Sequence, residues 1–127
     1  MYEFNNGGII KIAIADDHAL FREVLCREIN SWDNFKVILQ GDNGKELIEN
    51  INQRNLPTIA IVDINMQPMN GYATAEWLHT NHPEIRIIGL SFYNSEETAW
   101  PLVQSGASGF VNKCSYVNEL KKTALMY

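Results

Sequence analysis

Five polar side chains in this sequence each follow a short apolar run, and together they match the groups used in phosphoryl transfer. They are Asp16 and Asp17 after Ile9–Ala15, Asp63 after Ile59–Val62, Ser91 after Ile85–Leu90, and Lys113 after Phe110–Asn112. Three carboxylates close together would repel one another unless a cation lay between them. Mg²⁺ is the natural candidate, because it prefers oxygen ligands and completes its shell with water and phosphate. A carboxylate nucleophile, a metal, a hydroxyl and an ammonium are the requirements of phosphoryl transfer to an aspartate.

These side chains act together only if the runs before them are neighbouring strands of one sheet. A short apolar run without polar interruption indicates a strand that is buried on both faces of a parallel sheet. The carboxyl ends of parallel strands lie at one edge, where open sheets place their ligand crevice. Asp63 alone would be interpreted as a solvated loop residue, and Asp16 with Asp17 as a helix cap with a favourable dipole. The whole set favours a shared site.

Strands alternate with helices along the chain. The strands are predicted over Ile9–Ala15, Phe35–Leu39, Ile59–Asp63, Ile85–Leu90 and Phe110–Asn112. Helices are predicted over Ala19–Asn30, Lys45–Gln53, Tyr72–Thr80 and Tyr116–Met126. A further helix is predicted to begin after Ser95, which would serve as its N-terminal cap. Because Pro101 lacks a backbone donor, that further helix should be short, kinked or begin near Trp100.

The first helix shows an apolar face at helical spacing. Leu20, Phe21, Val24, Leu25 and Ile29 form this face, and the charged residues of the helix fall on the other side. The alternation of strands and helices along the chain predicts an α/β fold with a parallel five-stranded sheet and helices on both faces. We expect one domain over residues 9–127, preceded by a flexible leader at residues 1–8, with strand order 2-1-3-4-5.

Composition narrows the possible partners. The net charge is -5, which argues against direct contact of this segment with nucleic acid, because phosphate binding relies on clustered Lys and Arg. Neither a secretory signal nor an apolar run of about 20 residues is present, so no membrane association is expected. Cys26 and Cys114 lack metal-ligand spacing, and reduced thiols in a cytoplasmic protein are the expectation.

From about Lys11 to Leu125 the chain resembles the receiver domains of two-component response regulators. The residues that carry the resemblance are Asp16-Asp17-His18, Asp63, Met66 with Asn70-Gly71, Ser91, and the segment Gly106–Lys113. Asp-Asp-His and the Gly-Ala-x-Gly-aromatic pattern are most similar to the NarL/LuxR-type branch, whose receivers usually precede a helix-turn-helix domain. The resemblance implies a flavodoxin-like (βα)5 fold and a signalling domain with self-phosphorylation and dephosphorylation chemistry, not an enzyme acting on an external substrate.

The resemblance also implies a role for each site residue. Asp63 would accept a phosphoryl group from a sensor histidine kinase, while Lys113 and Ser91 would contact that group. Mg²⁺ would be bound directly by Asp17 and Asp63, through water by Asp16, and by the backbone carbonyl of Asn65.

Switching would couple Ser91 to Phe110, the aromatic residue that turns inward on activation. The implied output is transcriptional, through a helix-turn-helix DNA-binding domain outside this chain, and a second copy of the chain is a candidate partner.

Several positions depart from the family pattern. Gln67 stands where many members have proline, and Pro68 comes one residue later. Cys114 replaces another common proline, so no cis peptide is expected there. Phe92 follows Ser91 where many receivers have a small residue, which would narrow access to the phosphoryl pocket.

Three alternatives stay open at this point. Phe92, Gln67 and Pro101 support a receiver-like interaction module that does not use phosphorylation, whereas the complete set of acids argues against it. An aspartate-nucleophile phosphatase would share Asp63 and Mg²⁺ but needs a second acid as general acid-base and usually a cap domain. A flavin-binding protein of the same topology would need a phosphate-cradling first loop, where Asp16 and Asp17 would repel phosphate.

Overall fold

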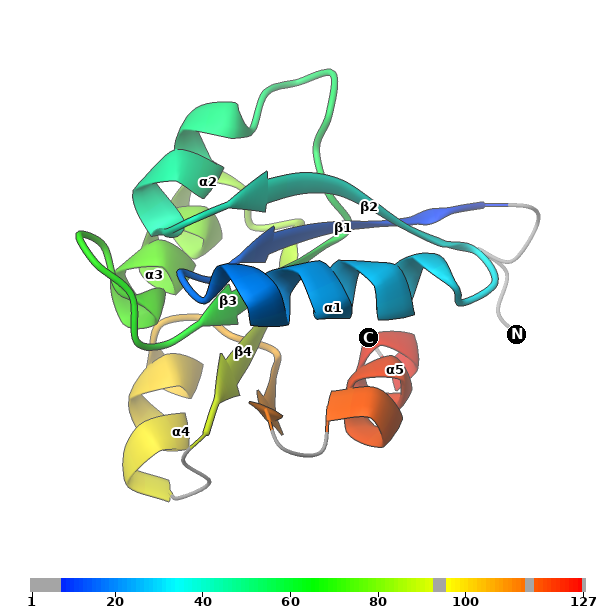
Figure 1. Ribbon diagram of the computed structural model, residues 1–127. Helices are drawn as coiled ribbons and strands as arrows, with labels where there is room; N and C mark the ends of the chain where they lie inside the picture. The colour runs from blue at the N-terminus through cyan, green and yellow to red at the C-terminus, as the bar shows by residue number, and fades with distance from the viewer. Residues whose placement is uncertain (1–7, 93–95, 114–115, 127) are drawn as a thin grey trace.

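In the computed structural model, which describes residues 8–92, 96–113 and 116–126, five strands alternate with five helices (Figure 1). The strands are β1 (Ile10–Ala15), β2 (Phe35–Gly41), β3 (Ile59–Asp63), β4 (Arg86–Ser91) and β5 (Gly109–Asn112). The helices are α1 (Ala19–Asn30), α2 (Gly44–Asn50), α3 (Gly71–Asn81), α4 (Glu96–Gln104) and α5 (Tyr116–Met126). Within these ranges no helix has the length and apolar character of a membrane span.

The strands form one parallel sheet in the order β2-β1-β3-β4-β5, which confirms the predicted topology. β1 and β3 are neighbours although a strand and two helices separate them in sequence. Their register pairs Ala15 with Val62, so the next residues, Asp16 and Asp63, lie side by side. The sheet therefore brings the two acidic segments together at one edge.

A hydrophobic cluster lies on each face of the sheet. On one face α1 and α5 cover Ile12, Ile14, Ile59, Ile61, Ile88, Leu90 and Val111. On the other face α2, α3 and α4 cover Ala13, Ala15, Ala60, Val62 and Ile87. The division follows from the pleat, because successive side chains of a strand point to opposite faces. Both faces are covered, as the uninterrupted apolar strands predict (Figure 1).

The buried side of α1 differs from the predicted apolar face. Leu25 and Ile29 are fully buried, and Phe21 is half-buried, as predicted. Leu20 and Val24, however, expose 67% and 44% of their surface, so their inward placement was wrong. A helix that lies on one face of a sheet buries only a stripe, and these two residues fall beside that stripe.

Helix α2 ends earlier than predicted. It stops at Asn50, and Ile51 is extended with ψ 131. Amide side chains then take over the backbone donors: Asn55 Oδ1 accepts from Asn52 N at 2.9 Å, and Asn52 Oδ1 accepts from Arg54 N at 2.8 Å. Asparagine side chains compete with the helical pattern in this way, and this competition explains the shorter helix.

Helix α4 contains Pro101 and runs from Glu96 to Gln104. The prediction of a short helix is confirmed, whereas a start near Trp100 is not. Two other expectations, the Ser95 cap and the trans peptide at Cys114, concern residues outside the described ranges, as does most of the predicted leader.

Candidate functional site

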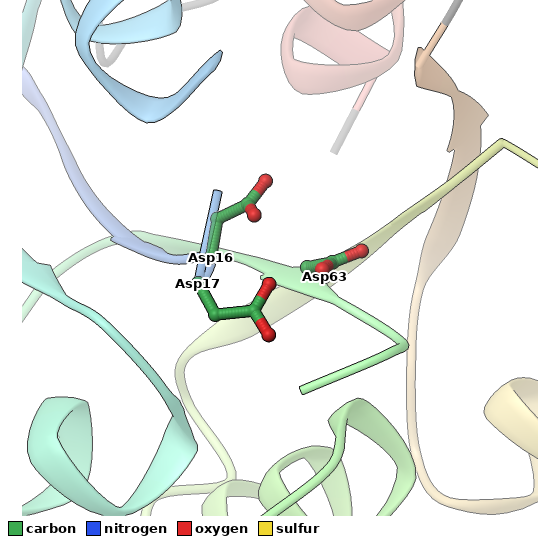
Figure 2. A group of neighbouring side chains, drawn as sticks. All are labelled: Asp16, Asp17 and Asp63. Atoms are coloured by element: carbon green, nitrogen blue, oxygen red, sulfur yellow. The ribbon is translucent and has the colours of Figure 1, made fainter. Parts of the chain in front are cut away.

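The three acids gather where β1 and β3 end (Figure 2). Asp16 and Asp17 follow β1, and Asp63 is the last residue of β3. One carboxylate oxygen from each residue lies within 4.8 Å of the others. The prediction that these acids share one site is therefore confirmed at the level of geometry.

Strand register adds Ser91 and Lys113 to the same edge. Asp63 pairs with Leu90, so Ser91 is the next residue along β4, and Ser91 in turn pairs with Asn112, which precedes Lys113. Asp16, Asp63, Ser91 and Lys113 are all buried, while Asp17 is exposed. The edge thus holds a largely dehydrated polar cluster with one carboxylate open to solvent.

The backbone around Asp16 is tied to its neighbours by several hydrogen bonds. Asp16 N donates to the Gly41 carbonyl at 3.1 Å, and Asp16 Oδ1 accepts from His18 N at 2.9 Å. Arg22 donates from Nη1 to the Asp16 carbonyl at 2.5 Å and pairs with Asp42 at 2.7 Å. These contacts fix the turn that joins β1 to α1 and hold the first acidic residue in place.

Lys113 provides the cation at the centre of the cluster. Its Nζ lies 2.9 Å from Asp16 Oδ2 and 3.3 Å from Asp63 Oδ1. Among the described residues, Asp16 Oδ2 is nevertheless a buried oxygen that accepts no hydrogen bond of good geometry. One ammonium therefore faces two buried carboxylates, with a third nearby, so these residues together carry more negative than positive charge.

Burial and charge repulsion together perturb Asp63. Loss of solvent raises the pKa of this carboxyl to about 6, and the negative charge of Asp16 adds to the effect. The Lys113 ammonium acts in the opposite direction and lowers the pKa of Asp63 only in part. An acid whose pKa is raised by its surroundings at a strand end is a candidate functional residue.

The donor set fits a hard divalent cation. Three carboxylates within 4.8 Å, one of them exposed, provide the oxygen ligands that Mg²⁺ prefers and leave room for water. A bound cation would also offset the repulsion that raises the pKa of Asp63. Asn65, predicted to contribute its carbonyl, is an exposed residue two positions beyond Asp63.

The two predicted switch residues lie on adjacent strands. Ser91 is the last residue of β4 and is fully buried. Phe110 lies in β5, is half-buried, and packs against the hydrophobic cluster beneath α2, α3 and α4. The register pairs it with Gly89, two residues before Ser91.

The loop after Asp63 leads directly into α3. Met66 is buried, and the Gln67–Pro68 peptide bond is cis. Asn70 caps α3 by accepting from Ala73 N at 2.9 Å. A Cβ on Gly71 would lie 2.5 Å from the Asp63 carbonyl oxygen, so the loop is closely packed against the strand end.

Two residues at the site were not identified from the sequence. Arg22 was assigned to the polar face of its helix, and Phe21 to the core. Phe21 does pack on the core, but its ring also lies under the Lys113 ammonium. Nothing in the local sequence signals either contact, because both depend on how α1 docks against β1 and β5.

Comparisons with known proteins agree along nearly the whole chain. Residues 12–125 match the family described as the response regulator receiver domain. The chain is 33% identical to the transcriptional regulatory protein DegU of Brevibacillus brevis over 113 residues, which cover 89% of the chain and 48% of that protein. It is 26% identical to the response regulator GacA of Pseudomonas protegens, covering 88% of the chain and 52% of that protein.

A solved structure shows the same arrangement. The signal receiver domain of a NarL response regulator from Mycobacterium tuberculosis superposes with a TM-score of 0.86 at 28% identity, covering 94% of this chain and 95% of that one. This chain spans about half the length of the curated relatives that it matches.

Proposed function

Since this chain belongs to the response regulator receiver domain family and has relatives of the NarL/LuxR type, we propose that Asp63 accepts a phosphoryl group from a sensor histidine kinase. The observation that carries the proposal is the position of Asp63, which is buried at a strand end with Lys113 Nζ 3.3 Å from Oδ1 and two further carboxylates close by. Family membership favours this signalling role over the phosphatase and flavin-binding alternatives.

In the proposed transfer an Asp63 oxygen attacks the phosphorus of the donor. The new O–P bond forms as the P–N bond of a phosphohistidine breaks, and its electron pair remains on the imidazole nitrogen. Lys113 contacts the phosphoryl oxygens and Ser91 donates a hydrogen bond to them, so that charge on those oxygens is stabilised as it develops. In dephosphorylation, water attacks the same phosphorus, the Asp63 carboxylate leaves, and phosphate is released.

The metal assigned to this chemistry is Mg²⁺. Asp17 and Asp63 are its proposed direct ligands, with Asp16 acting through water and Asn65 through its backbone carbonyl. When bound, Mg²⁺ supplies positive charge to the acids and to the phosphoryl oxygens. The three carboxylates within 4.8 Å of one another support this assignment.

Phosphorylation is proposed to shift an existing equilibrium between two conformations. Ser91 and Phe110 lie on neighbouring strands, which supports their proposed coupling as the switch. The proposed output is control of transcription, through a DNA-binding domain outside this chain. The proposed location of the protein is the cytoplasm. A second copy of the chain is a candidate partner, and direct contact of this segment with nucleic acid is not part of the proposal.

The proposal is tested by locating the phosphoryl group. The chain is incubated with acetyl phosphate and Mg²⁺, reduced with borohydride so that an acyl phosphate becomes an alcohol, and digested for peptide mass spectrometry. We expect homoserine at position 63 in the native chain and in the matched control Asp33→Asn, which alters an exposed acid. Homoserine at Asp16 or Asp17 would contradict the assignment, and its absence everywhere would favour the phosphorylation-independent interaction module.

A further inference from the structure

The Lys113 ammonium lies over the faces of two aromatic rings as well as beside two carboxylates. Its Nζ is 4.7 Å from the centroid of Phe21 and 5.0 Å from the centroid of Phe92. Both distances fall within the roughly 6 Å over which a cation is attracted to a ring face. One lysine therefore has four partners, two of them charged and two aromatic.

The two rings come from different elements and differ in exposure. Phe21 lies in the first turn of α1, half-buried against the core beneath α1 and α5. Phe92 is the first residue beyond β4 and exposes 55% of its surface. Among the described residues Phe92 belongs to neither hydrophobic cluster, and the face of its ring lies against Lys113.

The chemistry of lysine explains why such contacts would matter. Its ammonium sits on a flexible four-carbon stem and acts as a point charge that must be held in place by its surroundings. Here the carboxylates at 2.9 and 3.3 Å lie at the ends of different strands and compete for it. Ring faces attract the cation without carrying a net charge, so they restrain it without adding to the repulsion among the acids.

We propose that Phe21 and Phe92 are positioning residues that hold the Lys113 ammonium beside Asp63 in readiness for the phosphoryl group. The inference rests on the proposed function for its kinetic consequence, but the positioning itself is a property of the resting protein. It differs from the expectation that Phe92 only narrows access to the pocket. A bulky residue of any kind would narrow access, whereas positioning requires the aromatic face.

Kinetics separate these two roles. Phe92→Leu keeps an apolar side chain but removes the ring, and Phe92→Tyr keeps the ring. We expect Phe92→Leu to lower the phosphorylation rate constant at saturating acetyl phosphate about two- to fivefold, with little change in the half-saturating concentration, and Phe92→Tyr to restore the native rate. Trp100→Leu, which removes a ring that is 62% exposed on α4, is the matched control and should leave the rate unchanged. A rate that rises or stays constant in Phe92→Leu would overturn the proposal.

A spectroscopic measurement tests the positioning without any phosphoryl transfer. With lysine labelled by ¹³C at Cε, the Lys113 methylene protons should resonate upfield of the other lysines because ring currents shield nuclei above a ring face. Phe92→Leu and Phe21→Leu should each move this resonance downfield, and Trp100→Leu should not. If the native resonance lies among those of the other lysines, the positioning claim fails even where Asp63 is phosphorylated. If the shift is present but Asp63 accepts no phosphoryl group, the proposed function fails and the aromatic restraint of Lys113 stands.

Discussion

At the scale of single residues, the negative charge of the buried carboxylates at the site exceeds the positive charge of the lysine that they share. Asp16 and Asp63 are both buried and share one ammonium, that of Lys113. Desolvation and the neighbouring Asp16 raise the pKa of Asp63 to about 6. The protein therefore maintains an ionised Asp63 near neutral pH at a cost to its own stability.

This cost predicts a pH-dependent effect of Asp63→Asn on stability in the absence of Mg²⁺. The pKa of Asp63 is raised above its ordinary value in the folded protein, so between about pH 4 and pH 6 the folded state holds a proton on Asp63 that the unfolded state has lost. The free energy of unfolding therefore falls as pH rises through this range. At pH 7, Asp63→Asn should raise the free energy of unfolding by on the order of 2 kcal/mol. Urea denaturation at several pH values measures this difference.

The same comparison at pH 4 provides the control. There Asp63 is protonated in the folded state and only partly ionised in the unfolded state, because pH 4 lies close to its ordinary pKa of 3.8, so most of the advantage of Asp63→Asn should disappear. Asp33→Asn, at an exposed site, should show no such pH dependence. A gain for Asp63→Asn that is equal at pH 4 and pH 7 would show that the raised pKa is not its cause.

The identities of the charged residues could be predicted from the sequence, but their aromatic and arginine contacts could not. Asp63, Ser91 and Lys113 each come directly after an apolar run, and the strand ends of a parallel sheet lie at the same edge. Arg22 and Phe21 reach the site only because α1 docks at one particular angle and rotation. Periodicity alone placed Leu20 on the buried face, and the structure shows that the face is rotated away from it.

At the scale of elements, the boundaries set by apolar patterning were predicted more closely than those set by local hydrogen bonds. Helix α1 and strand β3 have the predicted bounds. Helix α2 ends early where asparagine side chains bind the backbone, and β2 extends to Gly41 because its last residues pair with Ile14 and Ala15 of β1. Such endings depend on side-chain geometry and strand pairing that an isolated stretch of sequence does not specify.

The junction between β3 and α3 should be sensitive to the size of residue 71. A Cβ there would lie 2.5 Å from the Asp63 carbonyl oxygen and 2.6 Å from Ile64 Cα, and both contacts are with backbone. Gly71→Ala should therefore displace the start of α3 or the end of β3, and lower the free energy of unfolding by about 1–3 kcal/mol. Because Asp63 ends that strand, its phosphorylation rate should fall as well. Denaturation and the acetyl phosphate reaction measure the two effects.

Asn43→Ala is the matched control for this variant. Asn43 caps α2 by accepting from Glu46 N at 2.9 Å, so its loss should cost about 1 kcal/mol. That helix does not adjoin Asp63 in sequence, and the phosphorylation rate of the folded Asn43→Ala protein should match that of the native chain. Equal losses of rate in both variants would mean that global stability, and not the junction, governs the reaction.

At the scale of the whole molecule, the sheet order brings four separated stretches of sequence together into one site. The order β2-β1-β3-β4-β5 follows from strand alternation and right-handed crossovers, and it was predicted from the sequence. The acids lie at the ends of β1 and β3, and they are contacted by Lys113, which follows β5, and by Arg22 of α1, so the site exists only in the folded chain. The sequence predicted that Asp16 and Lys113 share this edge, but their ion pair depends on the packing of both layers and was not predicted.

The most direct test of the central claim is the intact mass of the chain after incubation with acetyl phosphate, with and without Mg²⁺. We predict a single phosphoryl adduct that requires Mg²⁺, is lost in Asp63→Asn and is retained in Asp33→Asn. Circular dichroism of each sample establishes that the protein is folded. An adduct that persists in Asp63→Asn, or a folded native chain that gains no adduct with Mg²⁺ present, would contradict the assignment of Asp63 as the phosphoryl acceptor.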